Sequence, residues 1–557
     1  MFVSPENLFL QNSPDYPAFL LESGQVSFSQ FAARVGSAAN FFAKQGGKDF
    51  ILYVESDIVN FAALFFGLMQ AGKRALLPSS EKMAADFAKC AGIKIVSDSP
   101  ALDCEIFPQI KSLPDAPFAF KNMRRQKVCF FTSGSTSAPK MIEKTFATLS
   151  DETKNSAEVM GRFDECAIAS TCQPFHLYGM LWRLLYPLSA KMPIHARTVK
   201  DPETLMAIQR ENARAIFVTT PSFIEAVARH RELYSFPQNI AAITTSGGLL
   251  KKSASLSAKE IWGKTPTEIF GSTESGGIAL RDQGESQTWR VFKEVEISAD
   301  ERGCLRAKSP YCIGGAFQTN DLAKILSPKE FEFYGRIDRI VKIGETQLSL
   351  PDLEDAILED ENAEDCRAEF SENTLQALIV PSTTGKNFLL KNGRAKFLSI
   401  INSAIKKTFD AKFALRKIRL ANKIPANAQG KILKSEVRKI FNSKLEEPVI
   451  LRESESENSL EKEIYFSAEN TYFKGHFPVA KILPGAIQLH FAKKFICEKF
   501  GGCARLKTVK RLKFTNIIRP NEKILLKAKK DSENNFTFSY AKQGAQCSSG
   551  TLEFENA

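Results

Sequence analysis

The first 125 residues alternate short apolar runs with amphipathic segments. The run KDFILYVES at 48–56 has the unbroken apolar character of a buried strand, and Phe61–Gln70 has the length and pattern of a crossover helix. Two further units, at 213–223 and 239–250, each place an apolar run before a small-residue turn. Strands that alternate with helices form a buried sheet with helices on its faces, so the pattern predicts an α/β domain. We detect no internal repeat.

Length and composition limit the number of domains and the cellular compartments that fit this chain. A chain of 557 residues is too long for a single core, and its length predicts about three or four domains. The apolar run at 61–72 is too short to span a bilayer, and residues 1–17 lack the basic start and apolar core of a secretion signal. The 11 cysteines form no CxxC pair, which predicts reduced thiols. We therefore expect a cytoplasmic protein without an integral membrane segment.

One stretch, FFTSGSTSAPK at 130–140, has the composition of a phosphate-binding loop. An apolar strand end runs into five hydroxyl residues around Gly134, and Lys140 adds a compact positive charge. Such a loop can turn backbone N–H groups and hydroxyls towards an anion. A single glycine, with Pro139 before the lysine, separates it from the GxxxxGK[ST] loop of nucleotide hydrolases. Taken alone, the stretch also fits a Ser/Thr-rich surface turn.

The stretch resembles the phosphate loop of the adenylate-forming superfamily, which comprises acyl-CoA synthetases, carrier-protein ligases and peptide-synthetase adenylation domains. The family pattern is roughly [ST]SG[ST]TGxPK, and Ser137 stands where a glycine is usual. Further motifs follow in the family's order, so the resemblance extends over about residues 1–445. It implies that a set of loop residues binds the phosphates of ATP: Thr132, Ser133, Gly134, Ser135, Thr136 and Lys140.

Two later motifs resemble the adenine and α-phosphate contacts of this superfamily. The turn at 246–248 is similar to the adenine-side loop, and IFGSTES at 269–275 is similar to the aromatic-Gly-x-Thr-Glu motif. Glu274 would hold Mg²⁺, which needs a hard oxygen ligand. Phe270 replaces the commoner tyrosine beside the adenine. The nucleotide-binding residues implied here are Ser246, Gly247, Gly248, Phe270, Gly271 and Thr273.

Three more motifs complete the resemblance. QTND at 318–321 has Asn320 where the family has glycine, and it implies that Asp321 accepts hydrogen bonds from the ribose. In FYGRIDRIVKIGETQLSLPDLE at 333–354, Arg336 resembles the second ribose contact and Asp338 the hinge of a small mobile domain. The two remaining residues are Gly344, in the turn that enters the site after domain rotation, and Lys431 of IPANAQGKILK, which would reach the carboxylate and phosphate oxygens.

The segment QPFHLYGM at 173–180 places His176 among aromatic residues ahead of Gly179. A single histidine in apolar surroundings is usually a core residue. The superfamily has a similar aromatic/His-Gly segment beside its carboxylate pocket. The resemblance therefore implies that His176 and Gly179 contribute to the acyl-substrate site.

The last hundred residues resemble a second family, the hot-dog-fold 3-hydroxyacyl-carrier-protein dehydratases. FKGHFPVAKILPGAIQLHFA at 473–492 is close to the family's GHFPxxPxxPGxxxxE run. His476 matches the histidine that acts as base, and Gly485 begins the central helix whose dipole polarises the thioester carbonyl. His490 stands where the family has an acidic residue. Imidazole can also donate a proton near neutral pH.

The net charge of +12 is concentrated in this last part of the chain. Residues 461–557 hold 17 Lys and Arg against 9 Asp and Glu, an excess of +8. The excess fits a solvated basic surface or an acidic partner. No nucleic-acid motif with interleaved aromatic residues is visible, which favours a protein partner over nucleic acid.

Together these observations predict an α/β multidomain protein: an adenylation core at 1–334, a small mobile α+β domain at 335–445, an acidic linker at 446–459 around ESESE, and a hot-dog domain at 460–557. We expect ATP- and Mg²⁺-dependent activation of an aromatic or fatty carboxylic acid, then transfer to the phosphopantetheine thiol of an acidic acyl carrier protein. The resemblance suggests a fatty-acid-like or aryl-polyene pathway and a homodimer through the hot-dog domain. The expected catalytic residues are Thr132, Glu274, Lys431, His476 and His490.

Two alternatives remain open. The acceptor thiol could be free CoA, which requires the same chemistry. The hot-dog domain could lack catalysis and serve only to bind the carrier protein or to dimerise.

Overall fold

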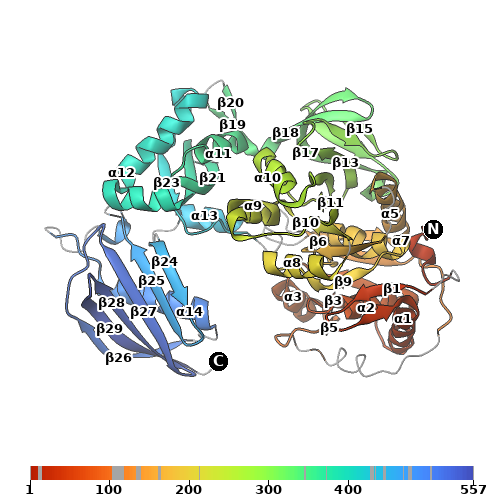
Figure 1. The fold of residues 1–557 in the computed structure, drawn as a ribbon, viewed down its shortest axis with the longest axis horizontal. Coiled ribbons are helices and arrows are strands. Elements are labelled where there is room, and N and C mark those ends of the chain that lie inside the picture. Colours follow the sequence, from red (N-terminus) through yellow and green to blue (C-terminus); the bar gives the residue numbers. More distant parts are fainter. Residues whose placement is uncertain are drawn as a thin grey trace. The chain divides into compact units, whose positions relative to one another are not determined.

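The computed structural model divides into two compact units, and Figure 1 traces the elements of each. The first unit is Met1–Ile337, and the second comprises Asp338–Ala426 and Ile432–Ala557. The division falls at Asp338, the residue for which the resemblance implies a hinge. The structure describes residues 2–10, 15–102, 104, 118–132, 140–160, 163, 165–212, 214–343, 346–371, 373–426, 432, 434–442, 447–467, 470–473, 480–501 and 505–555, with the side chains of Thr132 and Val159 excepted.

A five-stranded sheet holds the first of the predicted strand–helix units. Its strands lie in the order β5 (Lys94–Ser97), β3 (Asp49–Tyr53), β4 (Arg74–Leu77), β6 (Lys127–Thr132) and β7 (Lys140–Thr145), and only the β6–β7 pair is antiparallel. The helices of this region are α1 (Phe28–Ala43), α2 (Ile58–Gln70) and α3 (Glu81–Ala91). Nearly every residue of α2 is buried, as expected for a helix that is apolar on all sides. Gly67 lets α1 pack closely, because a Cβ there would lie 2.6 Å from Ala38.

A second, 13-stranded sheet forms the rest of the first unit. Its strands, in spatial order, are β15 (Glu296–Ala299), β16 (Cys304–Lys308), β17 (Ala316–Ser327), β18 (Glu330–Arg336), β14 (Trp289–Val291), β13 (Gly276–Asp282), β12 (Thr267–Ser272), β11 (Ile240–Thr245), β10 (Arg214–Thr219), β8 (Cys166–Ser170), β9 (Ile194–Thr198), β1 (Pro17–Leu20) and β2 (Gln25–Ser27). The run from β12 to β1 is parallel, and β12 turns back into β13 as an antiparallel hairpin. The predicted α/β class is therefore confirmed.

Helices follow several of these strands. They are α5 (Phe146–Met160), α6 (Leu177–Gly179), a π-helical turn at Met180–Leu185, α7 (Tyr186–Ala190), α8 (Pro202–Glu211), α9 (Pro221–Arg229) and α10 (Lys252–Trp262). None of the helices in the described part of the chain is long and apolar enough to cross a membrane.

The second unit begins with a small α+β region. It contains a β19–β20 hairpin (Ile340–Ile343 and Thr346–Ser349) and a three-stranded sheet in the order β21 (Ala363–Ser371), β22 (Thr374–Pro381) and β23 (Lys417–Leu420). Its helices are α11 (Leu350–Leu358), α12 (Thr383–Thr408) and α13 (Lys434–Asn442). Gly393 breaks α12 with a φ of 77°, a left-handed conformation that glycine adopts readily.

The second unit ends in a six-stranded antiparallel sheet packed against one helix, α14 (Gly485–Phe500). The strand order is β24 (Val449–Glu455), β25 (Ser459–Tyr465), β27 (Lys523–Ser532), β28 (Asn535–Lys542), β29 (Ala545–Phe554) and β26 (Leu506–Phe514). Phe491, Phe495 and Ile496 of α14 share a core with Leu526 and Phe538 of the sheet. A sheet around one long helix agrees with the predicted hot-dog domain, and the helix begins at the expected Gly485.

The predicted acidic linker at 446–459 is wrong. Half of it is strand β24, which pairs with β25 from Val449 to Glu455. Lys462 on β25 forms ion pairs with Glu453 and Glu455 and is almost fully buried. The high charge density suggested a solvated linker, but a lysine on the neighbouring strand neutralises the acidic side chains.

The C-terminal sheet and the small α+β region share one core. Val449 and Tyr465 are fully buried in the same apolar cluster as Leu389 and Phe397 of α12. The Tyr465 hydroxyl donates to the Leu389 carbonyl at 3.2 Å. Asn422 of the small α+β region also contacts the start of β24, because its Oδ1 accepts a hydrogen bond from the backbone N–H of Ile450 at 2.9 Å. The two regions therefore pack as one body.

Candidate active site

The first unit brings two predicted site residues together across its two sheets. Lys140 begins β7 of the five-stranded sheet, and Glu274 lies in the turn between β12 and β13 of the other sheet. The Lys140 Nζ lies 3.6 Å from a Glu274 carboxylate oxygen. Lys140 is 60% exposed and Glu274 is 17% exposed, so the pair is accessible from solvent. A ligand here would meet a cation and a carboxylate at once.

Hydrogen bonds within the turn and from residues 312–313 hold the Glu274 turn in shape. Inside the turn, Ser275 Oγ and the Ser272 hydroxyl lie 3.0 Å apart, and Ser275 Oγ accepts from the Ser272 N–H at 3.0 Å. The Ile313 N–H donates to the Glu274 carbonyl at 3.0 Å. The Cys312 thiol donates to the Ser275 carbonyl at 3.2 Å. Glu274 thus projects from a backbone that is fixed on two sides.

The predicted adenine contacts lie at the carboxyl ends of neighbouring parallel strands, where ligands bind in open α/β sheets. The Ser246 hydroxyl follows β11 and donates to the Ile269 carbonyl of β12 at 2.8 Å. Gly247 has a φ of +89°, which favours glycine, and both it and Gly248 are exposed. The backbone can therefore approach a flat ligand.

The ring of Phe270 is fixed by other aromatic side chains. It packs against Trp289, Phe331 and Phe333 with ring centroids 5.1–5.5 Å apart. Phe270 nevertheless stays half-buried, and the next residue, Gly271, is exposed. This packing provides a rigid apolar surface that the missing tyrosine hydroxyl does not affect.

The two predicted ribose contacts lie opposite each other. Asp321 on β17 and Arg336 on β18 are register partners, and an Arg336 guanidinium nitrogen lies 3.4 Å from an Asp321 carboxylate oxygen. The backbone N–H of Asp321 also bonds to the Thr319 hydroxyl at 3.0 Å. Asp321 is 16% exposed, so its carboxylate retains access to a ligand.

His176 lies in a tightly packed segment. Its Nε2 is buried with no hydrogen-bond partner among the described residues, and burial lowers the pKa of the imidazole to about 4. The ring packs on Phe175 at 4.8 Å, and Phe175 packs on Tyr53. Gly179 is required here, because a Cβ would lie 2.0 Å from the Gln173 carbonyl oxygen. His176 is therefore neutral at physiological pH, and its Nε2 has no hydrogen-bond partner among the described residues.

Several predicted site residues lie outside the described residues. They are Ser133, Gly134, Ser135, Thr136, Gly344, Lys431 and His476, together with the side chain of Thr132. Their roles stay predictions from the sequence. Thr273 is described and is half-buried beside Glu274.

Three buried charged residues near the site were not predicted. Lys144 and Glu152 form an ion pair with 1% and 3% exposure, 3.7 Å apart. Arg183, in the π-helical turn after His176, is also buried and donates to the Cys172 carbonyl and the Thr198 hydroxyl at 2.8 and 2.9 Å. Burial lowers the pKa of Arg183 to about 10. Lys144 lies four residues after Lys140 on one strand, and this spacing was the available signal.

The donor set fits a magnesium ion. Mg²⁺ is commonly held by one or two carboxylates with substrate phosphates and water, and Glu274 supplies such a carboxylate next to the ammonium group of Lys140. No group of three or more His, Cys, Asp or Glu side chains gathers as a metal cage within the described ranges. A metal at Glu274 would therefore depend on the nucleotide for its other ligands.

The C-terminal domain has its own candidate site, at the start of α14. Phe514 packs over Gly485 so closely that a Cβ there would lie 2.5 Å from the ring. The Ser548 hydroxyl donates to the buried Gln488 side chain at 2.6 Å. His490 is exposed on the same helix, and burial together with Lys494 and Lys493 lowers its pKa. The helix start is thus lined by an aromatic ring.

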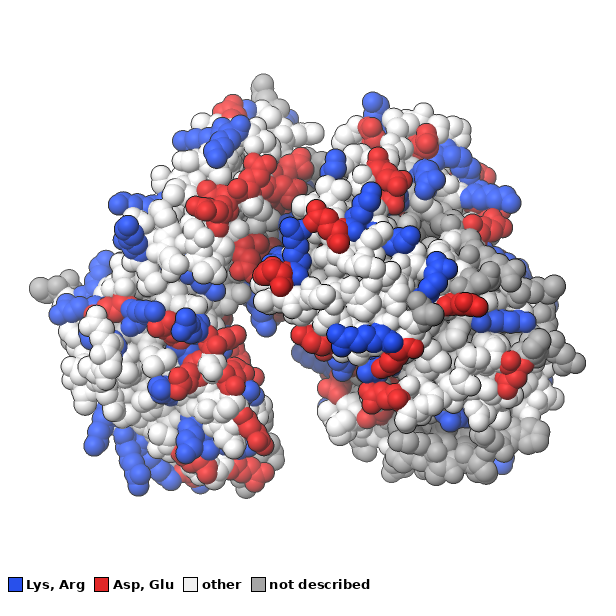
Figure 2. All heavy atoms as spheres, viewed as in Figure 1, with Lys and Arg blue, Asp and Glu red and all other residues white. Residues whose placement is uncertain are grey.

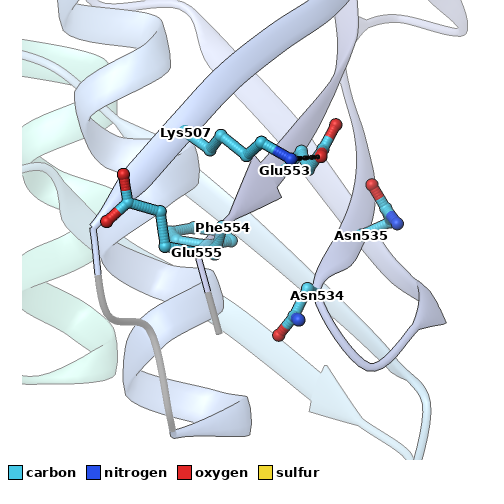
Figure 3. A pocket seen from close by; sticks show the side chains of 6 residues that line it. All are labelled: Lys507, Asn534, Asn535, Glu553, Phe554 and Glu555. Atoms are coloured by element: carbon cyan, nitrogen blue, oxygen red, sulfur yellow. Dashed lines mark hydrogen bonds and ion pairs between the residues drawn. The ribbon is translucent and has the colours of Figure 1, made fainter. Parts of the chain in front are cut away.

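A hollow of 320 Å³ lies at the other end of β26. Figure 3 shows Lys507 reaching across it to Glu553, at 2.8 Å. Lys507 and Lys510 lower the pKa of Glu553 to about 2. Phe514 lies seven positions after Lys507 along β26, roughly 23 Å in an extended strand, so the hollow is distinct from the helix start.

Basic side chains gather on the outer edge of this domain, over β26 and β29 at the lower left of Figure 2. Arg511 and Lys513 belong to this edge and are exposed, as are the apolar Leu512 and Phe514 at 37% and 51%. Since β26 is the last strand of its sheet, its outer backbone groups are available for pairing.

Two family models match the chain. Residues 78–298 match the AMP-binding enzyme family, and residues 452–551 match the ApeI-like family, described as ApeI dehydratase. A 4-coumarate–CoA ligase of Cereibacter sphaeroides is 24% identical over 46% of this chain and 59% of that ligase. A 4-coumarate–CoA ligase of Halorhodospira halophila is 25% identical over 54% of this chain and 74% of that ligase.

Solved structures share the fold of the adenylation part. The anthranilate CoA ligase AuaEII in complex with anthranoyl-AMP matches with a TM-score of 0.66 and 14% identity, over 79% of this chain and 97% of that one. ATP-bound MatB from Rhodopseudomonas palustris matches with a TM-score of 0.66 and 14% identity, over 80% and 99%. At this identity the similarity establishes the fold.

Proposed function

The chain carries an AMP-binding enzyme domain fused to an ApeI-like dehydratase domain, and from this premise we propose that it activates a carboxylic acid with ATP. A carboxylate oxygen attacks the α-phosphorus, the bond between the α- and β-phosphates breaks, and pyrophosphate leaves the acyl-adenylate. A thiolate then attacks the acyl carbon and displaces AMP. The Lys140–Glu274 pair is the observation that carries the proposal, because it joins a phosphate-binding cation to a metal-binding carboxylate.

The described residues divide the work of binding. Lys140 neutralises phosphate oxygens, and Glu274 would hold Mg²⁺, which supplies charge neutralisation to the nucleotide when bound. Asp321 accepts from the ribose, and Phe270 with the 246–248 turn bounds the adenine. His176 remains neutral beside the acyl group, since a charged imidazole in that buried position is disfavoured.

Lys431 is proposed to stabilise the charge that moves between carboxylate and phosphate during adenylation. A lysine suits this role because a flexible stem delivers a strongly hydrated point charge to a closing site. In the resembling superfamily the small domain rotates between the two half-reactions, so Lys431 would serve only the first.

The test is a screen of aromatic and fatty acids for pyrophosphate release, with Lys431→Ala as the matched variant. We expect at least one acid to be activated, and we expect the variant to lose roughly a hundredfold in adenylation rate. The variant should still form thioester from supplied acyl-adenylate. Failure of every acid would contradict the proposed activity, and pyrophosphate exchange at the wild-type rate in the variant would remove Lys431 from the mechanism.

For the C-terminal domain we propose a 3-hydroxyacyl-carrier-protein dehydratase-like role in a homodimer. The exposed edge strand β26 and the exposed His490 support a site that a second copy of the chain completes. The phosphopantetheine arm of an acidic carrier protein would place its thioester at Gly485. The alternative, a docking or dimerisation module without catalysis, uses the same surface.

Hydration of a 2-enoyl carrier protein by the full-length chain distinguishes the two roles. We expect activity in the wild type and a wider alkaline range in His490→Glu, which restores the family's acidic residue. Light scattering should give the mass of a dimer. If neither the wild type nor His490→Glu hydrates the 2-enoyl carrier protein, and both still dimerise and bind carrier protein, the C-terminal domain is a docking module.

A further inference from the structure

A buried ion pair involves the same strand, β7, that carries Lys140 of the proposed magnesium site. Lys144 and Glu152 are 1% and 3% exposed, and the Nζ lies 3.7 Å from Glu152 Oε2. Lys144 is four residues after Lys140 on β7, and alternate residues of a strand share one face. Lys140 therefore meets Glu274 at the surface, while Lys144 enters the interior on the same side.

The lysine fixes one end of the Glu274 turn. Its Nζ donates to the Tyr311 carbonyl at 2.9 Å. The next residue, Cys312, bonds to the Ser275 carbonyl, and Ile313 bonds to the Glu274 carbonyl. One buried cation thus positions the backbone segment that holds the turn.

The glutamate fixes the other end of the turn. Glu152 Oε1 accepts from the backbone N–H of Gly277 at 2.7 Å. Gly276 has a φ of 68°, and a Cβ there would lie 2.6 Å from the Tyr311 ring and 2.8 Å from Glu152 Oε2. Asn155, one helical turn after Glu152, donates to the Tyr311 hydroxyl at 3.1 Å. Lys144, through the segment at 311–313, and Glu152 therefore both support the turn between Glu274 and Gly277.

Stability alone does not account for the pair. Burying two charges costs several kcal/mol per ion, and apolar replacements of buried ion pairs are often neutral or stabilising. The specific use of the charges here is to reach the Tyr311 carbonyl, beside the segment that bonds Glu274 and Ser275, and the backbone N–H of Gly277. Neither contact requires the pair to touch a ligand.

We propose that Lys144 and Glu152 are positioning residues that set the Glu274 carboxylate against Lys140 for the metal–nucleotide complex. The proposal rests on the proposed adenylation. Without the pair, the turn would lose its two supports, and Glu274 would populate positions from which it cannot hold a metal bound to ATP.

The test measures metal binding apart from turnover. Mn²⁺ with α,β-methylene-ATP serves as the probe, and calorimetry gives its Kd in wild type, Lys144→Met, Glu152→Met and the double variant. We expect the Kd to rise about tenfold in each single variant. In pyrophosphate exchange, the Mg²⁺ concentration at half-saturation should rise to the same extent, while kcat at saturating Mg²⁺ falls less than threefold.

The double variant separates positioning from stability. Removing both charges should restore much of the melting temperature that each single variant loses, because no unpaired charge stays buried. The Kd for the Mn²⁺ complex should stay raised, since the contact to the Tyr311 carbonyl is still absent. Recovery of both quantities together would overturn the proposal.

A second buried ion pair provides a matched control. Arg281 and Glu268 lie at the far end of the same β12–β13 hairpin, 2.6 Å apart, with 7% and 2% exposure. Glu268→Gln should lower the melting temperature and leave the Kd within twofold of wild type. If Lys144→Met behaves like this control, the inference is wrong. Wild type that binds the probe but adenylates no acid would contradict the proposed function alone.

Discussion

The chemistry of His176 follows from its surroundings. Its imidazole is buried without a partner for Nε2 among the described residues, so its protonated form is strongly disfavoured. The motif at 173–180 identified this residue, because a histidine between aromatic residues is visible in the sequence alone. The Lys144–Glu152 pair was missed, because its contacts depend on how a strand of one sheet faces a turn of the other.

The lowered pKa of His176 predicts a pH dependence of stability. The unfolded chain takes up a proton near pH 6.5, whereas the folded protein takes it up only near the pKa of about 4. The contribution of neutral His176 to the free energy of unfolding is therefore complete above pH 6.5. It falls by up to about 3 kcal/mol as the pH falls towards 4. In His176→Gln, the free energy of unfolding should not show this decrease between pH 6.5 and pH 4.

Tryptophan fluorescence in urea measures this loss for the first unit, since Trp182, Trp262 and Trp289 all lie there. The quantity that isolates His176 is the difference between wild type and variant at each pH, because carboxylates titrate in both. A difference that stays constant from pH 7 to pH 4 would mean that the imidazole protonates freely in the folded state.

Individual elements were predictable where one apolar pattern determined them. The strand at Asp49–Tyr53 and the helix at Ile58–Gln70 have uniformly apolar sequences, and α14 begins at the glycine that the motif indicated. Strand β24 was not predictable in the same way. Its outer half carries exposed charge, and the lysine that stabilises it belongs to the next strand, across a turn that charge density alone does not reveal.

Lys462 should therefore be important for β24. Its side chain is 8% exposed, pairs with Glu453 and Glu455, and lies 5.5 Å over the Phe495 ring. Lys462→Met would remove the cation that pairs with Glu453, while Glu455 keeps Lys499 at 2.9 Å, and we expect a loss of about 1–3 kcal/mol in local stability. Hydrogen exchange of the β24 amides reports this opening directly.

Lys527→Met is the matched control, because Lys527 pairs with Glu461 on the neighbouring strand but is 53% exposed. Exposed ion pairs contribute about 0–1 kcal/mol, so β24 exchange should change little in this variant. Equal acceleration of exchange in both variants would show that burial of Lys462 makes no difference.

At the scale of the whole molecule, charge is distributed unevenly between the parts. The excess of +8 over residues 461–557 lies in the domain that carries the basic edge strand β26. The sequence was sufficient to predict this bias, since it requires only counting. It did not reveal that the small α+β region and the C-terminal sheet form one compact unit, because that depends on packing between distant segments.

If the acceptor is an acidic carrier protein, the positive electrostatic potential of the C-terminal domain should accelerate its association with that carrier protein. We expect carrier protein to outcompete CoA as thiol acceptor at low salt. The advantage should shrink as salt rises, because exposed charges are screened beyond roughly 8 Å at physiological ionic strength. Competition between the two acceptors for one acyl-adenylate, measured from low to high salt, gives the ratio. Equal acylation of CoA at low salt would favour the CoA synthetase alternative.

The core shared by Tyr465, Val449 and α12 has a mechanical consequence. Any rotation about Asp338 would carry both the small α+β region and the C-terminal sheet, because the two cannot turn independently without exposing that core. In a dimer joined through its C-terminal sheets, the small α+β regions of both copies would then be held in fixed positions by that dimer. The first unit would then be the part that rotates about Asp338. Each copy of the dimer would carry one such rotating unit.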